Sequence, residues 1–431
     1  MDFPDSQVSA RIFWRRLKKH PLWRLGPGLI TGVADDDPSG IATYSQAGAQ
    51  FGLNMLWTMP LAFPLMAAIQ SMCARIGRVT GKGLAANIKT TFPPIVLQGV
   101  VLLLLIANTL NIAADVAAMG EVAELVSGFN RHLMTMLFVF VTLLLQVFVP
   151  YHRYVFFLKW LTLSLLAYAA VLFTVHVPWG QVALRTVWPK FTPNANAAAV
   201  IVGVFGTTIS PYLFFWQASE EVEDMLEKQG ATPLVRDARA AGVELRRIKW
   251  DTWTGMFYSD ITAYFIILAT AVTLNVEGIT DINTAAQAAR ALRPLAGDFA
   301  YILFALGILG VGLIGVPVLA GSGAYALSEA MGWKWGLERK TTDAYGFYGV
   351  IAVSMLAGLV IQYSPISPMK ALFWTAVING VVAVPLMVVI IMLASKKSVM
   401  GDFTATRSLI ILGWIATAVM GAAAVRMFIP G

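Results

Sequence analysis

Three consecutive carboxylates, Asp35, Asp36 and Asp37, interrupt an otherwise apolar segment that runs from residue 26 to residue 48. Pro38 and Gly40 follow them directly, and both residue types weaken a helix at that point. Placing one carboxylate at the middle of a bilayer costs about 2.5–3.5 kcal/mol, so acidic residues inside a membrane segment usually serve a function. An unwound segment also frees carbonyl oxygens. The residues therefore predict a site that binds a cation.

The composition indicates a helical membrane protein with many spans. Hydrophobic residues make up 58% of the 431 residues and charged residues only 13%. A single cysteine, Cys73, excludes an internal disulfide framework and a cysteine-rich metal site. The sequence contains no glycine-rich nucleotide loop, no His-Glu-x-x-His and no Gly-x-Ser-x-Gly, so we expect neither an enzyme nor a bound cofactor.

Apolar stretches of about 20 residues are long enough to cross a bilayer as helices. They predict eleven transmembrane helices, at residues 27–48, 53–75, 96–126, 132–150, 155–177, 197–219, 252–275, 298–328, 343–363, 371–394 and 408–428.

The basic residues are distributed unevenly between the two sides that these spans define. With residues 1–26 in the cytoplasm, 24 of the 31 lysines and arginines fall in cytoplasmic segments. The positive-inside rule therefore predicts a cytoplasmic N-terminus and a C-terminus outside, in the inner membrane of a bacterium. The first span carries carboxylates and no cleavage motif, so we expect it to be retained. The net charge of +7 is explained by these loops and anionic lipid, which argues against a nucleic-acid partner.

The sixth span is interrupted in the same manner as the first. Glycine and proline recur between Gly203 and Pro211, five spans after the first interruption. Interrupted helices at corresponding positions are typical of an inverted repeat. We therefore expect one transmembrane domain over residues 1–431. Its predicted parts are a cytoplasmic segment (1–26), a first repeat (27–177), a second repeat (197–394) and an additional helix (408–428).

Several motifs resemble those of the NRAMP family of divalent-metal transporters. The family's first-helix signature is similar to three stretches here, Gly26-Pro27-Gly28, Asp37-Pro38-Ser39-Gly40 and Gln46-Ala47-Gly48-Ala49. Weaker similarity lies in residues 70–84, around Asp115 and in residues 293–307. The resemblance implies an all-α integral membrane protein of the LeuT type, a 5+5 inverted repeat with helices one and six broken. It also implies alternating access and a metal site between these two helices.

The metal ligands that the resemblance implies are only partly kept. Asp37 matches the family's aspartate, but Gly40 stands at the asparagine position and Thr207 at the position of the carbonyl donor. Ser210 replaces the methionine whose sulfur binds the ion in the family. Losing a thioether favours hard cations, and the smaller side chains would leave room for water, which Mg²⁺ retains. We expect a metal site formed by Asp37, Gly40, Thr207 and Ser210, with Mg²⁺ as the leading substrate and Mn²⁺ next.

The residues that the resemblance links to protons are also altered. Tyr212 replaces the histidine that follows the sixth-helix proline, and a tyrosine hydroxyl is a poor proton carrier near neutral pH. Ala118 stands at the position of the family's third-helix glutamate, although Asp115 remains. Such losses resemble the NRAMP-related magnesium transporters, which implies transport without protons.

Other polar residues allow two interpretations each. Asp35 and Asp36 could attract a hydrated cation or could bond to backbone amides freed by the break. Asn379, in the tenth span, could approach the ion or could join helices through its amide. Glu220 and Glu221 could line an exit for cations, but a helix end paired with arginine or lysine is the favoured interpretation.

Two other functions remain open at this point. A proton-coupled transporter of Mn²⁺ or Fe²⁺ would use Asp115 or another carboxylate, since oxygen ligands bind manganese as well as magnesium. A LeuT-type transporter of a small organic solute is the second alternative. In each case the partners we expect are the lipid bilayer and the transported solute, with no obligatory protein partner.

Overall fold

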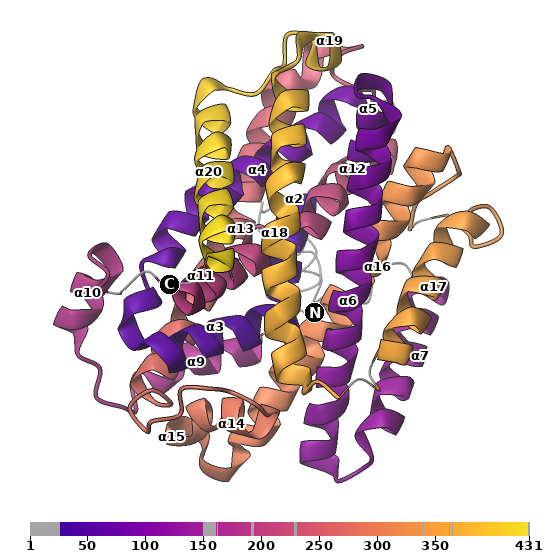
Figure 1. Ribbon diagram of the computed structural model, residues 1–431. Helices are drawn as coiled ribbons and strands as arrows, with labels where there is room; N and C mark the ends of the chain where they lie inside the picture. Colours follow the sequence, from indigo (N-terminus) through magenta and orange to yellow (C-terminus); the bar gives the residue numbers. More distant parts are fainter. Residues whose placement is uncertain are drawn as a thin grey trace, which may run out of the picture.

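A computed structural model describes residues 26–429, apart from 150–160, 162, 191–193, 228–230, 338, 362 and 364. Every regular element among these residues is helical. Figure 1 shows long helices that run in similar directions, with α14 and α15 at one end and α5 and α19 at the other. The expectation of an all-α membrane architecture is confirmed. The predicted cytoplasmic segment 1–26 lies almost wholly outside the described residues.

The first and sixth spans are both broken, as the sequence predicts. The first consists of α2 (Pro27–Asp35) and α3 (Pro38–Phe51), and the sixth of α11 (Ala195–Thr208) and α12 (Pro211–Glu227). In each case a proline opens the second half, where its missing N–H costs no hydrogen bond. Asp37 precedes Pro38 in an extended conformation, which is the backbone region that a following proline favours.

The remaining elements complete the helical bundle. Seven long helices are α4 (Thr58–Thr80), α6 (Pro94–Ser127), α7 (Arg131–Phe148), α13 (Ala241–Val272), α16 (Ala300–Met331), α18 (Pro368–Ser395) and α20 (Arg407–Phe428). Shorter helices are α5 (Leu84–Thr91), α9 (Leu166–Val171), α10 (Trp179–Val187), α14 (Ala285–Ala289), α15 (Arg293–Ala296), α17 (Tyr345–Ile361) and α19 (Lys397–Met400). Single 3₁₀ turns lie at Gly52–Met55, Leu163–Leu165, Ala238–Ala240, Arg290–Leu292 and Gly297–Phe299.

The number and bounds of the spans differ in part from the eleven that the sequence predicts. Eight helical segments of the described chain are long and apolar enough to cross a membrane. The broken first span and the shorter α17 match two further predictions, whereas the predicted span 155–177 falls partly outside the described residues. The seventh span was predicted to begin at residue 252, but α13 begins at Ala241. Its first turns are polar, and ion pairs with neighbouring helices allow them to remain helical.

Glycine contacts set how closely the first half-helix packs on α13. A Cβ added at Gly32 would overlap the backbone of Gly255, and one added at Gly255 would overlap the backbone of Gly28. Helices in a membrane associate closely where small residues let their backbones meet. On α16, a Cβ at Gly315 would lie 3.1 Å from the Cβ of Asp37. The first span is therefore closely packed near its break against both α13 and α16.

A candidate cation site at the broken helices

Asp37 is the N-cap of α3, and four donors hold its carboxylate. Oδ1 accepts hydrogen bonds from the backbone N–H of Gly40 (2.8 Å) and the hydroxyl of Ser39 (2.6 Å). Oδ2 accepts one from the amide of Asn111 (2.9 Å) and lies 3.3 Å from the hydroxyl of Tyr212. The residue is 1% exposed. None of these donors carries a positive charge, so the helix N-terminus and neutral dipoles stabilise the carboxylate.

The break in the sixth span lies opposite Asp37. The hydroxyl of Thr207 is 3.5 Å from that of Ser39, which itself bonds to Asp37. Ser210 donates to the carbonyl oxygens of Thr207 (2.6 Å) and Gly206 (2.9 Å). A serine hydroxyl thus satisfies carbonyls that the end of α11 would otherwise leave free. Thr207 thus approaches Asp37 through Ser39, and Ser210 is bonded to the carbonyl of Thr207.

The space beside Gly40 is already filled. A Cβ at Gly40 would lie 3.2 Å from the Thr207 hydroxyl and 3.3 Å from a ring carbon of Tyr44. The Tyr44 hydroxyl in turn lies 3.3 Å from that of Thr208. A wider site was expected at Gly40, but in this conformation the ring of Tyr44 takes up part of that space.

Asp35 and Asp36 turn toward α13. The hydroxyl of Ser259 lies 2.5 Å from Asp35 Oδ2 and 3.0 Å from Asp36 Oδ1, so a single hydroxyl group is within hydrogen-bond distance of both acidic side chains. Both residues are buried, and Asp35 Oδ1 and Asp36 Oδ2 have no hydrogen-bond partner. Neither residue faces an open vestibule in this conformation, because α2 packs closely on α13.

Asp115 and Asn379 are also buried. Neither carboxylate oxygen of Asp115 has a well-formed hydrogen bond, and neither side-chain polar atom of Asn379 has a partner. Asn379 lies in the part of α18 where Ala376 and Gly380 contact the backbone of Gly206. It therefore lies in the part of α18 that packs on the last turn of α11, beside the break in the sixth span.

The acidic residues at the far end of α12 are held by partners from other helices. Glu221 is fully buried and pairs with Arg247, whose nearest guanidinium nitrogen is 2.5 Å from the carboxylate. Glu220 lies 3.2 Å from the hydroxyl of Tyr325. These contacts favour the interpretation as a paired helix end over an exit lined with free carboxylates.

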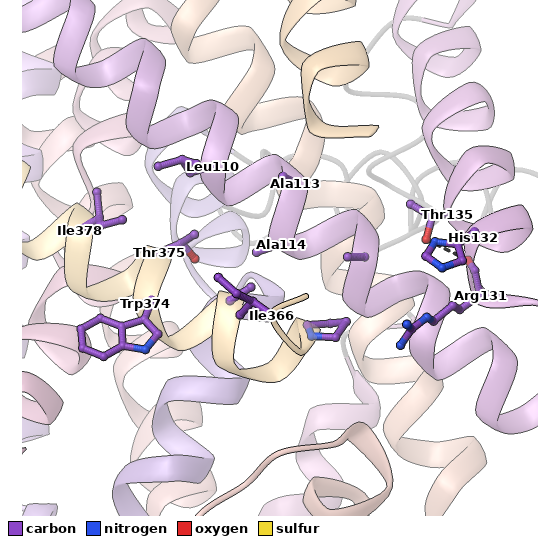
Figure 2. A pocket seen from close by; sticks show the side chains of 13 residues that line it. Leu110, Ala113, Ala114, Arg131, His132, Thr135, Ile366, Trp374, Thr375 and Ile378 are labelled. Carbon is purple, nitrogen blue, oxygen red and sulfur yellow. Dashed lines mark hydrogen bonds between the residues drawn. The ribbon is translucent and has the colours of Figure 1, made fainter. Parts of the chain in front are cut away.

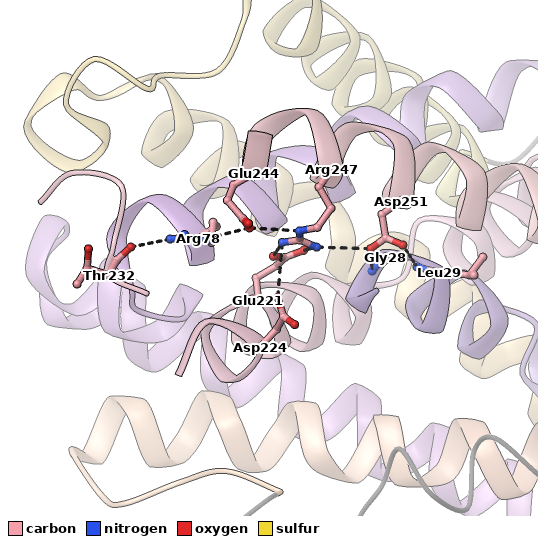
Figure 3. A network of polar contacts seen from close by, with 9 residues as sticks. All are labelled: Gly28, Leu29, Arg78, Glu221, Asp224, Thr232, Glu244, Arg247 and Asp251. Atoms are coloured by element: carbon pink, nitrogen blue, oxygen red, sulfur yellow. Dashed lines mark hydrogen bonds and ion pairs between the residues drawn. The ribbon is translucent and has the colours of Figure 1, made fainter. Parts of the chain in front are cut away.

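Arg247 is the centre of a wider ion-pair network, shown in Figure 3. It also lies within ion-pair distance of Asp224 (3.8 Å), Glu244 (3.2 Å) and Asp251 (3.9 Å). Arg78 extends the network through Glu244 (3.2 Å). Helices α4, α12 and α13 are thereby joined at one end of the molecule.

The same network holds the start of α2. Asp251 accepts hydrogen bonds from the backbone N–H groups of Gly28 (2.8 Å) and Leu29 (3.3 Å). Both N–H groups belong to the first turn of the helix, where donors lack the usual partner four residues back, and that of Leu29 also bonds to the Gly26 carbonyl (3.1 Å). A carboxylate there also complements the helix dipole, so α2 is anchored to α13 through Asp251.

Two cavities lie away from Asp37. One is lined by Ala113 and Ala114 of α6, Trp374 and Thr375 of α18, and His132 at the start of α7. Figure 2 shows Arg131 beside His132 at one end of this cavity. Apolar walls and a guanidinium group are unsuited to a divalent cation.

The second cavity is more polar and borders α3, α11 and α18. Its lining includes Gln46, Gln50, Asn196 and an ion pair between Lys370 and Asp281 (3.5 Å). It therefore lies between one half of each broken helix and α18.

Three residues around Asp37 were not among the predicted site residues: Ser39, Tyr44 and Asn111. Asn111 could have been found from the pattern of α6, because Asn108, Asn111 and Asp115 recur at helical spacing in an apolar segment. The bond from Ser39 to Asp37 is local to the start of α3, whereas the place of Tyr44 depends on how α3 meets α11, for which the sequence holds no signal.

Comparison with protein families gives a match over nearly the whole chain. Residues 28–430 match the family model described as natural resistance-associated macrophage protein-like. A divalent metal cation transporter (MntH) of Acidiphilium cryptum is 27% identical over 97% of this chain and 90% of its own length. The MntH of Verminephrobacter eiseniae is 28% identical over 81% of this chain and 80% of its own length.

Solved structures share the fold. A manganese transporter of Eremococcus coleocola superposes with a TM-score of 0.75 at 17% identity, covering 99% of this chain and 88% of that one. Mhp1, a nucleobase-cation-symport-1 family transporter, gives a TM-score of 0.57 at 14% identity, covering 94% and 92%. These likenesses confirm the expected LeuT-type architecture with its broken helices.

Replacing Arg247 with glutamine tests the ion-pair network. The change leaves Glu221 buried without its positive partner, which we expect to destabilise the protein by about 3 kcal/mol. Thermal unfolding of the purified protein in detergent should show a lower midpoint. Arg239→Gln is the matched control, because Arg239 pairs with Asp237 at the surface and its loss should leave the midpoint unchanged. Equal midpoints for Arg247→Gln and the unchanged protein would show that the network does not stabilise this end.

Proposed function

This chain belongs to the natural resistance-associated macrophage protein-like family, and on that premise we propose that it carries divalent metal cations across a bacterial plasma membrane, Mg²⁺ foremost. The family consists of metal transporters and not of enzymes. The observation that carries the proposal is the buried Asp37 carboxylate at the meeting point of two broken helices, with no positive side chain among its hydrogen-bond donors.

The groups around Asp37 support a hard cation. Hydroxyl, amide and carbonyl oxygens lie at this interface, and they come from Ser39, Asn111, Thr207, Ser210 and Tyr212. Oxygen ligands suit Mg²⁺ and Mn²⁺, whereas thioether sulfur favours softer metals. Ser210 stands where the family has methionine. The proposed metal ligands are therefore Asp37, the Thr207 carbonyl and the Ser210 hydroxyl, with Gly40 beside them.

The proposed mechanism is alternating access by two inverted repeats. The repeats would span residues 27–177 and 197–394, with 408–428 as an additional helix. Two of the segments counted as cytoplasmic, those at α5 and α19, share one end of the molecule, and α14 and α15 lie at the other. This arrangement supports a cytoplasmic N-terminus and an outer C-terminus. The Arg247 network would then close the cytoplasmic side while the ion is held.

Transport without protons is part of the proposal. Tyr212 occupies the histidine position of the family, and its hydroxyl lies near the Ala34 carbonyl (3.2 Å) and Asp37. A membrane potential supplies about 2.3 kcal/mol per charge per 100 mV, or about 4.6 kcal/mol for a divalent ion. That energy supports more than about three decades of accumulation, so uptake needs no second ion.

Manganese is the second candidate substrate, because the relatives include a manganese transporter and several divalent metal cation transporters. Oxygen ligands do not by themselves separate Mg²⁺ from Mn²⁺. An organic solute is disfavoured, since carboxylates facing the site would repel an anion and require a cation beside a zwitterion.

Replacing Asp37 with alanine tests the site directly. The variant removes the carboxylate on which the proposed site depends, so we expect uptake of Mg²⁺ and Mn²⁺ into proteoliposomes to fall to background. Size-exclusion chromatography should show that the protein remains folded. Asp402→Ala, which changes an exposed aspartate, serves as the control and should transport normally. Undiminished uptake by Asp37→Ala would exclude this site.

Replacing Ser210 with methionine tests metal preference. A thioether at this position should strengthen binding of Cd²⁺ and Mn²⁺ relative to Mg²⁺, by about tenfold or more, because sulfur prefers softer cations. Competition between these metals in an uptake assay measures the ratio. Ser210→Ala removes the hydroxyl without adding sulfur and should leave the ratio near that of the unchanged protein. The same ratio in all three proteins would place Ser210 away from the ion.

A further inference from the structure

A line of polar residues runs along one face of α6, an otherwise apolar helix of 34 residues. Asn108, Asn111 and Asp115 lie three, four and seven positions apart, so they share this face. All three are buried, with exposed fractions of 2% or less. Buried polar groups in a membrane helix are costly unless a partner satisfies them. The face therefore requires an explanation in terms of what it contacts.

Asn108 is a structural amide. Its nitrogen donates to the carbonyl of Leu319 (2.9 Å) and to the hydroxyl of Ser322 (2.7 Å), both on α16. These bonds join two helices, which is a common use of an amide inside a membrane. The role of Asn108 on this face is therefore to join α6 to α16.

Asn111 differs, because its amide meets the candidate cation site. Its nitrogen donates to Asp37 Oδ2 (2.9 Å), while its oxygen, Oδ1, is buried and has no partner. An amide that donates to a carboxylate necessarily lies beside it, and its free oxygen is then available to a cation held there. Asparagine oxygen is a ligand that hard divalent cations accept.

Asp115 lies one turn further along the same face. It is fully buried, and the backbone N–H of Ser39 and the carboxylate of Asp37 both lie close enough to act on its carboxyl group, although neither of its oxygens has a hydrogen bond of normal geometry. Two ionised carboxylates in this position would be costly in a low-dielectric interior unless a cation were bound beside them. A divalent cation bound to both would neutralise the two negative charges, whereas a monovalent cation would neutralise only one.

We propose that α6 supplies part of the cation site, with Asn111 Oδ1 and the Asp115 carboxylate binding the ion together with Asp37. The family's first-helix amide is missing at Gly40, and the place of its Cβ is confined by Thr207 and Tyr44. Asn111 provides an amide oxygen to the same carboxylate from a different helix. The resulting ligands are two carboxylates and one amide, all oxygen. This inference rests on the proposed function, since it names further ligands for the same ion.

Substitutions at Asn111 separate a ligand from a residue that only positions Asp37. Asn111→Ala removes both the donor and the oxygen, and we expect Mg²⁺ and Mn²⁺ to bind at least about tenfold more weakly. Asn111→Asp removes the N–H donor but keeps an oxygen, so binding should stay within about threefold of the unchanged protein. Asn108→Ala is the matched control on the same face and should bind normally. Isothermal titration of the purified full chain with each metal alone measures these affinities.

Two results would overturn the inference. Equal weakening in Asn111→Asp and Asn111→Ala would mean that the amide serves Asp37 only as a donor. Normal binding by Asn111→Ala would mean that the residue does not contact the ion. If Asn111→Ala cannot be purified, Asn111→Ser keeps a small polar side chain that is too short to reach the site, and the same comparison applies. Absence of divalent binding by the unchanged protein would contradict the proposed function itself and would be seen before any variant is compared.

Discussion

The structure is organised around a buried negative charge that has no positive side chain among its hydrogen-bond donors. The Asp37 carboxylate is held by the start of α3, by Ser39, by Asn111 and by Tyr212, so three separate helices supply its donors. In a low-dielectric interior such a charge is tolerated only where dipoles are already aimed at it or where a cation binds. The break in the first span, the break in the sixth and the polar face of α6 all meet at this point. A transported cation is the natural counterpart of that arrangement.

The end of the molecule at which α4, α12 and α13 meet is held by a different kind of contact. There the carboxylates are paired with arginines, and Arg247 alone approaches Glu221, Glu244 and Asp251. Asp251 also caps α2, which packs on α13 through glycine backbones. Its other end is held by the hydroxyl of Ser259 on Asp35 and that of Tyr212 on the Ala34 carbonyl, so α2 is fixed at both ends. The molecule thus combines an unpaired charge at its centre with paired charges at its end, which is the distribution expected of a site for a mobile cation and a gate beside it.

Much of this arrangement could be predicted from the sequence because its causes are local. The proline and glycine residues beside Asp37 and Ser210 interrupt the helices in which they occur, whatever the surrounding tertiary structure. Carboxylates in an apolar segment likewise indicate a functional site. The missing parts depend on contacts between distant residues. Asn111 is 74 positions from Asp37, and Asp35 meets Ser259 across 224 positions, so neither pairing leaves a local signal. The early start of α13 was missed for a related reason, because its first turns are polar and pair with Arg78 of α4 and Glu221 of α12, which are distant in the sequence.

The central claim is that one buried carboxylate site passes divalent cations down the membrane potential without protons. Its most direct test places the purified protein in liposomes that contain a metal-sensitive dye and a pH-sensitive dye, and imposes an inside-negative potential. The account predicts Mg²⁺ entry that increases with the potential while the internal pH stays constant. Metal entry accompanied by acidification in a fixed ratio would contradict it and would establish a proton-coupled transporter, with Asp115 as the first carboxylate to examine.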